Sequence, residues 1–391
     1  MWALLWTGPC DRFFLVCISF MNQLLYDIFQ AYYDARCNKR NTISQLEFEL
    51  DFEHELFQLH EELSAWTYEI WPSICFIISD PVKREVFASS FRDRVVHHLV
   101  YNYIYDFFDR RFIHDSYSCR LEKWTHYGIK RLDHFIRSCS QNYTRDCYIL
   151  KLDIQWFFMN INKEILKQKI TEKLTAFECL SVDKQRLLRL IYQIIDHDST
   201  KDYIFRWNIS DYDWLPKEKS LFHTWANKWL PIWNLTSQLF ANIYLDDFDK
   251  FMKYKLWLKY YGRYVDDFFI IHEDKEHLKS LLHQIRQYLT DKLQLTLHPN
   301  KIYLQHYSRW VKFLGVYLKP RRTYIHRRTL WNFKKKIRGL SFMWDKKQEL
   351  NIVNSYLGIL RHGRNFTIRK NVLNTLSDFS FDEYFICWTI K

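Results

Sequence analysis

Residues 261–271 read YGRYVDDFFII, and this short stretch decides how the rest of the chain is interpreted. Two adjacent carboxylates, Asp266 and Asp267, lie between two runs of aromatic and apolar residues that are typical of strands. The pattern predicts a β-hairpin with both carboxylates at its tip. Buried charges need compensation there, and Mg²⁺, which prefers carboxylate oxygens, is the usual cation. An ordinary Asp-Asp turn is the alternative for this stretch taken alone.

A third carboxylate follows another apolar strand earlier in the chain. Asp153 ends the run 148–152, and Phe157 and Phe158 come shortly after it. If the two strands are adjacent, the three carboxylates can hold two Mg²⁺ ions, which is the arrangement used for phosphoryl or nucleotidyl transfer. Because the chain also has a basic aromatic C-terminal part and no Walker-type loop, the pattern favours polymerisation on a nucleic-acid template.

The composition excludes a disordered, collagen-like or disulfide-based protein, because 48% of the 391 residues are hydrophobic and the nine Cys form no CxxC pair. At roughly 100–200 residues per domain, the length predicts about two to four lobes. The net charge is +12, and residues 301–344 contain twelve Lys and Arg but no Asp or Glu. A run of positive charges among aromatic residues favours a surface that binds nucleic acid. Ordinary solvation of these charged side chains is the alternative.

The N-terminal stretch is apolar but interrupted by Gly8, Pro9 and two charges, so it is too short for a membrane span. We expect a cytoplasmic protein with reduced cysteines and no membrane association. A signal peptide is the alternative. Met21 begins a more regular helical pattern, so residues 1–20 are expected to be an N-terminal appendage of unknown role.

Periodicity indicates an α+β fold. Helices are predicted at 21–35, 45–63, 92–108, 162–173, 236–255 and 275–292, strands at 73–79, 146–154, 296–305 and 311–318, and a hairpin at 259–271. The order strand, helix, hairpin, helix, strand in the middle of the chain is typical of an antiparallel sheet with helices on one face.

Several motifs in this order resemble those of reverse transcriptases. Residues 264–267 (YVDD) look like the YxDD box, and 152–158 (LDIQWFF) is similar to the first catalytic motif. Further matches are residues 84–98 and 118–126 in the fingers, 230–242 in the palm and 313–315 at the primer grip. The chain is therefore identified as a member of the reverse transcriptase family, and the resemblance covers about residues 70–320.

The resemblance implies RNA-directed DNA polymerase activity and a right-hand polymerase fold. The expected parts are the fingers and N-terminal helices at 21–147, the palm at 148–320 with a fingers insertion at about 175–228, and a basic helical thumb at 321–391.

The resemblance also implies roles for single residues. Asp153, Asp266 and Asp267 are the implied ligands of two Mg²⁺ ions, for which Mn²⁺ can substitute, and the carbonyl of Ile154 is a further implied ligand. The implied nucleotide-binding residues are Arg84, Arg92, Phe158, Ile232, Gln238 and Lys301, and the implied primer grip is Phe313, Leu314 and Gly315.

These nucleotide contacts have specific chemical roles and ordinary alternatives. Arg84 and Arg92 are candidate triphosphate clamps, because guanidinium forks fit phosphate oxygens, and a surface salt bridge is the alternative for each. Phe158 falls where the family places the aromatic that blocks a 2′-hydroxyl, and a core position is its alternative. Lys301 is a candidate proton donor to the leaving pyrophosphate or a template contact.

Residues 232–238 (IWNLTSQ) indicate the subfamily. Most reverse transcriptases have QGxxxSP there, whereas IWNLTSQ resembles the (I/V/L)GxxxSQ form of bacterial and phage diversity-generating retroelements. This implies error-prone copying of a template RNA, chiefly at adenines, and partners that include the template RNA, a cDNA primer, dNTPs and an accessory basic oligomeric protein. Ile232 cannot hydrogen-bond beside the nascent base pair, so discrimination falls. The alternatives are a retron, group II intron-like or antiphage enzyme, or a defective nucleic-acid-binding relative.

Glycine and tryptophan occur in unusual numbers. The chain has 7 Gly, where an average of about 7% would give roughly 27, and 16 Trp. Trp stands where relatives tend to have Gly at Trp71, Trp124, Trp156, Trp229, Trp233 and Trp310. The hypothesis that follows is that UGA codons read as glycine in the source were translated as tryptophan. Real Trp residues would instead distort the palm.

Overall fold

The computed structural model describes residues 23–37, 42–78, 83–176, 183–206, 220–225, 227–232, 234–340 and 346–360. Contacts between residues divide the chain into two compact units. The first consists of Met1–Ile113, Ile154–Phe251 and Arg286–Leu297, and the second of His114–Asp153, Met252–Ile285 and His298–Lys391, as far as they are described. The bounds expected for the fingers, palm and thumb differ from the bounds of these two units, and the division into those three parts stays a prediction. Residues 1–20, Trp233 and the chain after 360 lie outside the described residues.

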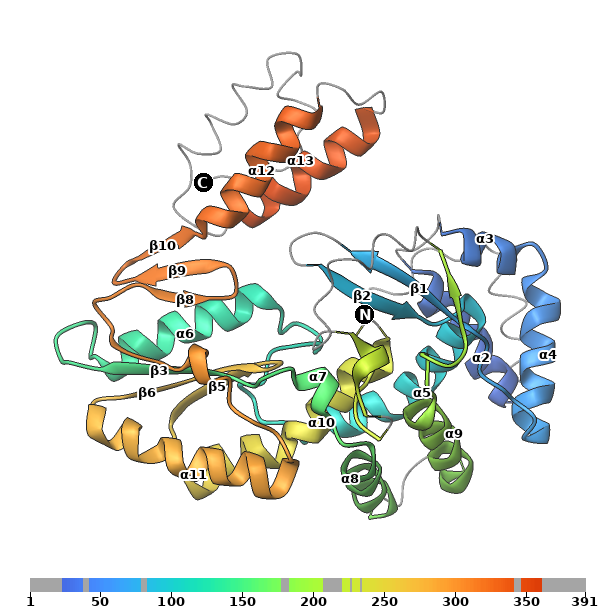
Figure 1. Ribbon diagram of the computed structural model, residues 1–391, viewed down its shortest axis with the longest axis horizontal. Coiled ribbons are helices and arrows are strands. Elements are labelled where there is room, and N and C mark those ends of the chain that lie inside the picture. The colour runs from blue at the N-terminus through green and yellow to red at the C-terminus, as the bar shows by residue number, and fades with distance from the viewer. Residues whose placement is uncertain are drawn as a thin grey trace. The chain divides into compact units, whose positions relative to one another are not determined.

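The first unit is mainly helical (Figure 1). Its helices are α2 (Gln23–Arg36), α3 (Ile43–Glu49), α4 (Phe52–Ala65), α5 (Phe91–Asp109), α7 (Phe157–Asn160), α8 (Lys163–Thr175), α9 (Lys184–Asp196) and α10 (Leu235–Lys250). The long helix α5 begins after Ser90, whose side chain accepts a hydrogen bond from the N–H of Asp93. It is buried along most of its length and packs against α2 and α10, so it is the central helix of this unit.

A small sheet completes the first unit. It has the order β2 (Arg84–Ala88), β1 (Ser73–Ile78), β4 (Tyr203–Phe205), in which β1 pairs antiparallel with β2 and parallel with β4. The predicted single helix 45–63 is wrong, because it is two helices, α3 and α4. The backbone leaves the helical region at Asp51, where φ is −143°.

The second unit contains two antiparallel sheets. The first has the order β5 (Tyr260–Tyr264), β6 (Asp267–His272), β3 (Tyr148–Asp153), β7 (Tyr303–His306). The second is β10 (Arg322–Ile325), β9 (Val316–Lys319), β8 (Val311–Phe313). The unit also contains α6 (Thr125–Cys139), α12 (Arg327–Leu340), α13 (Lys346–Leu360) and the beginning of α11 (Lys275–Leu293). The predicted hairpin at 259–271 and strand at 146–154 are confirmed as β5–β6 and β3.

Helix α6 forms the core of the second unit. It packs against β5 and β6, and its apolar side chains share one buried cluster with residues from both sheets. Leu132 of α6, Ile149 of β3 and Phe269 of β6 are members of this cluster, as is Phe313 of β8. Burial of this apolar surface fixes the sheet that carries the three carboxylates. None of the described helices is both long and apolar enough to cross a membrane.

The predicted strand at 311–318 is wrong, because the structure forms a hairpin there. Strands β8 and β9 are joined by Leu314 and Gly315, whose φ angles are 46° and 80°. Two successive positive φ angles are the mark of a type I′ turn, which matches the twist of the strands that it joins. Likewise, the predicted strand at 296–305 begins only at Tyr303, because η5 (Pro299–Lys301) is a 3₁₀ turn.

Four tryptophans have a left-handed backbone. They are Trp66, Trp156, Trp229 and Trp257, with φ angles of 65°, 47°, 88° and 53°, among nine Trp in the described part of the chain. This conformation favours glycine. It therefore supports the recoding hypothesis at Trp156 and Trp229, which were named from the sequence. Trp66 and Trp257 are two further positions where the backbone favours glycine. Of the other four named positions, Trp71, Trp124 and Trp310 have no positive φ, and Trp233 is not described.

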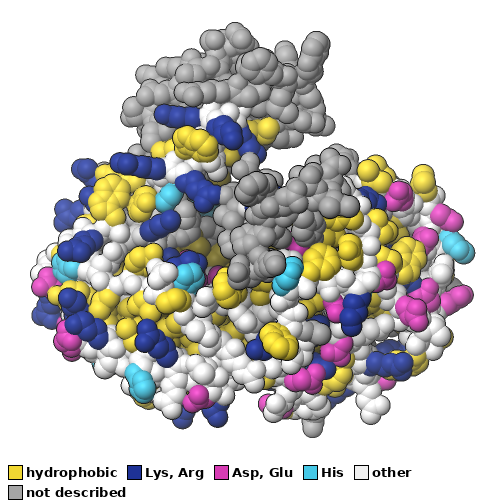
Figure 2. Space-filling view, in the orientation of Figure 1, with side chains coloured by type: hydrophobic (Ala, Val, Ile, Leu, Met, Phe, Trp, Pro, Cys, Tyr) yellow, Lys and Arg dark blue, Asp and Glu magenta, His cyan; other side chains and the backbone are white. Residues whose placement is uncertain are grey.

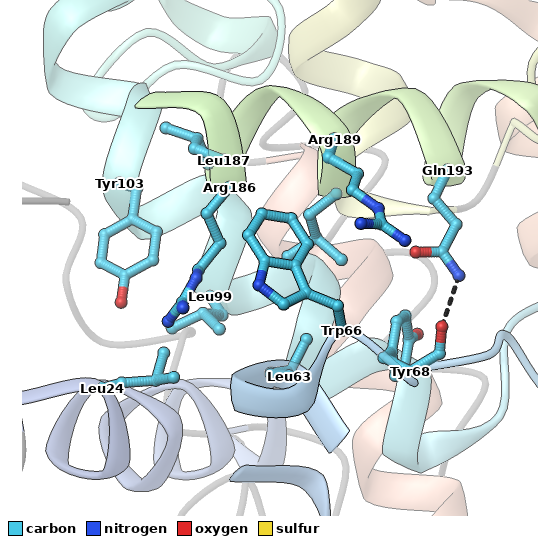
Figure 3. Close-up of a pocket in the computed structure, with 11 residues that line it drawn as sticks. Leu24, Leu63, Trp66, Tyr68, Leu99, Tyr103, Arg186, Leu187, Arg189 and Gln193 are labelled. Carbon is cyan, nitrogen blue, oxygen red and sulfur yellow. Dashed lines mark hydrogen bonds between the residues drawn. The ribbon is translucent and has the colours of Figure 1, made fainter. Parts of the chain in front are cut away.

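Trp66 illustrates most clearly the conflict between a large side chain and a backbone conformation that favours glycine. It follows the last turn of α4 in the left-handed conformation, a place that glycine usually takes. Figure 3 shows its indole in a pocket beside the guanidinium groups of Arg186 and Arg189, whose Cζ atoms lie 5.2 and 4.7 Å from the ring centroid. The indole therefore makes contacts with two arginines, but the backbone of Trp66 has a conformation that is typical of glycine.

The substitution Trp257→Gly is expected to raise the free energy of unfolding by about 1 kcal/mol. The indole is 82% exposed, so little packing is lost, while the strain of a positive φ is removed. Trp331→Gly is the matched control, since Trp331 is 62% exposed within α12 and has no positive φ. This change should lower the free energy of unfolding by about 1 kcal/mol, as glycine does inside a helix. Urea denaturation measures both, and equal losses would contradict the interpretation.

Candidate active site

Three carboxylates meet at one end of the four-stranded sheet in the second unit. Asp153 is the last residue of β3 and is the direct partner of Asp267, the first residue of β6. Residues opposite each other on antiparallel strands have Cβ atoms about 4.5–5.5 Å apart. Asp266 immediately precedes Asp267. The strands that carry the acids are therefore adjacent, as the sequence predicted.

Asp266 occupies the second position of a two-residue turn. Tyr264 and Asp267 close the β5–β6 hairpin, and Val265 and Asp266 form the turn between them. Val265 has a φ of 56°, and Asp266 is not among the described residues with positive φ. This is the pattern of a type II′ turn, in which glycine is the usual first residue. A β-branched residue there stores strain of about 1–3 kcal/mol.

Two lysines pair with two of the acids. The Nζ of Lys301, at the end of η5, lies 2.9 Å from each carboxylate oxygen of Asp153. The Nζ of Lys151 lies 3.0 Å from Oδ1 of Asp267, and these two side chains are only 17% and 21% exposed. Lys151 precedes Asp153 by two residues on β3, so both side chains lie on the same face of the sheet.

Asp266 is the acid without an ion pair among the described residues. Burial raises its pKa to about 7, and the negative charges of Asp153 and Asp267 add to this effect. Burial also raises the pKa of Asp267, although the charge of Lys151 opposes it. Burial and two neighbouring negative charges therefore both disfavour the ionised form of Asp266.

The three carboxylates are ligands of the type that a hard divalent cation prefers. Carboxylate oxygens are the preferred ligands of Mg²⁺, and a cation would offset the burial and the neighbouring negative charges that raise the pKa of Asp266. In the described chain, no three His, Cys, Asp or Glu side chains converge on a ready-made metal position. Since Lys301 already pairs with Asp153, a metal ion bound by Asp153 would have to displace this lysine. Ile154, the other implied ligand, is fully buried and forms a bridge with Leu297.

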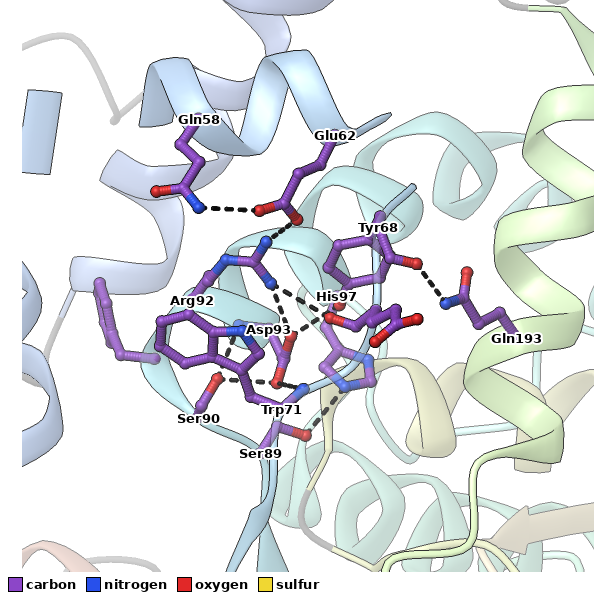
Figure 4. Close-up of polar contacts among 12 residues, drawn as sticks. Gln58, Glu62, Tyr68, Trp71, Ser89, Ser90, Arg92, Asp93, His97 and Gln193 are labelled. Atoms are coloured by element: carbon purple, nitrogen blue, oxygen red, sulfur yellow. Dashed lines mark hydrogen bonds and ion pairs between the residues drawn. The ribbon is translucent and has the colours of Figure 1, made fainter. Parts of the chain in front are cut away.

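Arg92 lies in a buried network at the start of α5 (Figure 4). Only 1% of it is exposed, and its guanidinium forms an ion pair with Glu62. The guanidinium also lies over the rings of Tyr68 and Trp71, with Cζ 5.2 and 4.7 Å from their centroids. The network fixes the beginning of α5 to α4 and to the segment that follows α4. These contacts give Arg92 a structural role and argue against direct contact with a triphosphate.

The other implied nucleotide contacts of the first unit are more accessible. Arg84 begins β2, is exposed, and forms no ion pair with any residue that the structure describes. Phe158 is half-buried on α7, with its ring 5.4 Å from that of Phe157. Ile232 and Gln238, on either side of the beginning of α10, are also half-buried.

The implied primer grip lies at the β8–β9 hairpin of the second unit. Phe313 is buried, with its ring 5.2 Å from that of Phe269 on β6. Leu314 and Gly315 form the turn, and the carbonyl of Gly315 accepts a hydrogen bond from the N–H of His326 at 2.9 Å. The hairpin is therefore packed against the same sheet that carries the acids.

Sequence reasoning missed two cations that contact the acids or their turn. Lys151 holds Asp267, and Arg263 on β5 donates to the carbonyl of Val265 at 2.9 Å. A signal was present for both, because each is a charge within an otherwise apolar strand. Their partners were not evident, since strand register decides them.

The three acids and their lysine partners lie within a stretch of the chain that matches a known protein family. Residues 83–318, more than half of the chain, match the family described as reverse transcriptase (RNA-dependent DNA polymerase). The chain belongs to the reverse transcriptase family. As a reverse transcriptase it has the α+β right-hand polymerase fold, with helices and antiparallel sheets.

Solved structures similar to this reverse transcriptase include telomerases. Apo telomerase from Candida tropicalis, truncated from its C-terminal domain, is 13% identical with a TM-score of 0.47, and the match covers 64% of this chain and 53% of that one. Telomerase from Candida albicans in complex with a TWJ fragment of telomeric RNA is 11% identical with a TM-score of 0.43, covering 82% and 61%. The reverse transcriptase thus spans less than two thirds of either chain. A comparison with curated protein sequences gives no match.

A double-mutant cycle between Lys151→Met and Asp267→Asn is expected to give a coupling free energy of about 1–2 kcal/mol at pH 8, because the pair is largely shielded from solvent. The pKa of Asp267 is raised, so its carboxylate takes up a proton at a higher pH than an ordinary Asp. The coupling should therefore shrink as the pH falls to 5. Urea denaturation of the four proteins measures it, and a coupling of zero at pH 8 would refute the ion pair.

Proposed function

We propose that this reverse transcriptase extends a DNA primer on an RNA template with dNTPs as substrates. The observation that carries the proposal is the meeting of Asp153, Asp266 and Asp267 at adjoining strand ends, with Asp266 lacking an ion pair among the described residues. Membership of the reverse transcriptase family supports it.

In the proposed reaction, Asp153, Asp266 and Asp267 would hold two Mg²⁺ ions, with the Ile154 carbonyl as a further ligand and Mn²⁺ as a substitute. When bound, these ions lower the pKa of the primer 3′-hydroxyl and neutralise the triphosphate. Lys301, displaced from Asp153, is then a cation beside the site that can protonate the leaving pyrophosphate. Arg84 is the triphosphate clamp that needs no buried ion pair to be broken.

A basic surface in the second unit supports binding of the nucleic-acid substrate. None of the ten Lys and Arg from Arg309 to Lys336 forms an ion pair with a described carboxylate. Figure 2 shows such side chains on the visible face over the β8–β10 sheet and the start of α12, with few acidic side chains among them. Unpaired cations of this kind neutralise backbone phosphates, so binding should weaken as salt rises.

We further propose the diversity-generating type of reverse transcriptase, on the strength of Ile232 and Gln238 in the palm motif. Ile232 is half-buried just before α10 and offers no hydrogen bond to a base pair. The proposed partners are a structured template RNA, a cDNA primer and an accessory basic oligomeric protein, and the proposed compartment is the cytoplasm. A retron, group II intron-like or antiphage enzyme is the alternative.

Asp266→Asn is expected to reduce primer extension on an RNA template by about a thousandfold or more, because a metal ligand at the transition state is lost. RNA binding should stay unchanged, since the basic surface is untouched. Asp266→Asn is assayed in two backgrounds. One has tryptophan at the six positions where relatives tend to have glycine, and the other has glycine at all six. Retained extension by Asp266→Asn would refute the proposed catalytic role, and extension in neither background with Asp266 intact would favour a binding protein.

Ile232→Gln is expected to lower misincorporation opposite template adenines by about tenfold, because a hydrogen-bonding side chain beside the nascent pair restores discrimination. Sequencing of cDNA made from one defined template measures this rate. Ile232→Val is the matched control and should leave the rate unchanged. Equal rates in all three proteins would contradict the diversity-generating interpretation while leaving polymerisation intact.

A further inference from the structure

A buried arginine holds the two-residue turn that carries Asp266. Arg263 lies on β5, two residues before Val265, and is only 1% exposed. Its Nη1 donates to the carbonyl of Val265 at 2.9 Å, and its Nη2 donates to Oγ of Ser116 at 3.2 Å. Because a guanidinium presents its donors in a rigid planar fork, these two bonds fix the direction in which the Val265 carbonyl points.

The backbone of Arg263 is held as firmly as its side chain. Its N–H donates to the carbonyl of Asp115 at 2.9 Å, and its carbonyl accepts from the N–H of Tyr117 at 3.0 Å. On the other side it pairs in register with Phe268 of β6. The guanidinium therefore reaches the turn from a fixed position.

The direction of the Val265 carbonyl distinguishes two turn types. Type I′ and type II′ turns both have a positive φ at the first residue, but the peptide between their two central residues is rotated by about half a turn. Type I′ also needs a positive φ at the second residue, and Asp266 is not among the described residues with positive φ. The peptide between Val265 and Asp266 therefore has the type II′ orientation. Glycine, the residue that normally selects this turn, is missing from position 265.

The same peptide controls Asp266 directly. Its oxygen belongs to Val265 and is bound by Arg263, while its nitrogen belongs to Asp266. Because this nitrogen is bonded to the Cα that carries the Asp266 side chain, rotation of the peptide would break the bond to Arg263 and redirect the carboxylate.

We propose that Arg263 is a positioning residue, which keeps this peptide in the type II′ orientation and so aims the Asp266 carboxylate toward the metal position that it shares with Asp153. The inference rests on the proposed function, in which Asp266 binds a metal ion. It assigns to Arg263 a role in the reaction that involves no contact with substrate or metal.

Binding of Mn²⁺ to the full chain, without template or nucleotide, tests the proposal by electron paramagnetic resonance. Arg263→Lys keeps the charge but loses the fork, and it should weaken Mn²⁺ binding by about ten- to hundredfold, as loss of a residue that orients a metal ligand does. Adding Val265→Gly should restore binding and folding, because glycine selects the type II′ turn by itself. This rescue keeps the test decisive even if Arg263→Lys alone does not fold.

Ser116→Ala is the matched control. It removes the Nη2 bond of the same guanidinium but keeps the Nη1 bond to the Val265 carbonyl, so it should lower the melting temperature and weaken Mn²⁺ binding much less than Arg263→Lys does. Unchanged affinity in Arg263→Lys, or no recovery on adding Val265→Gly, would overturn the positioning role. Equal Mn²⁺ binding by the unaltered chain and Asp266→Asn would instead overturn the proposed function itself, so the two failures are distinguishable.

Discussion

The site depends on one register, the pairing of β3 with β6 that places Asp153 opposite Asp267. A shift of one residue would turn the side chains of one strand to the other face and separate the acids. The same register brings Lys151 to Asp267, while Lys301 reaches Asp153 from η5. Two of the three negative charges are thereby compensated within the protein. Asp266 is left with its pKa raised to about 7, which makes it the acid with most to gain from a bound cation.

The same rule, that a buried charge needs a partner, separates the two candidate triphosphate clamps. Arg92 already serves Glu62, and binding a triphosphate would leave that carboxylate partly buried without its cation. Breaking one side of such a pair costs about 3–5 kcal/mol. Arg84 is exposed at the start of β2 and forms no ion pair with a described residue, so it can bind phosphate without this loss. Burial, which a sequence motif does not record, therefore ranks two arginines that looked equivalent.

Much of the fold and the acids themselves could be predicted from the sequence, because long apolar runs that end on charges have few interpretations. This is why β3 and the β5–β6 hairpin were found, and why the acids were placed at strand ends. The β8–β9 turn was missed, because its residues continue the apolar pattern of the strands and Gly315 was the single sign of it. The partners of Lys151 and Arg263 were beyond prediction, since they depend on which strands become neighbours and in which register.

The backbone shows which parts of this structure depend on the identity of the tryptophans. Two glycines of the sequence stand where glycine is needed, since Gly315 has a φ of 80° and a side chain at Gly262 would collide with Tyr117. The positive φ angles at Trp66, Trp156, Trp229 and Trp257 place the same demand on residues that cannot meet it without strain. Yet the contacts described at the three acids are made by Asp, Lys and Arg side chains and by backbone groups, and none by an indole. Glycine at those four positions would remove no charge and no ion pair from the sheet that carries the three acids, so the electrostatics of the site hold under either decoding.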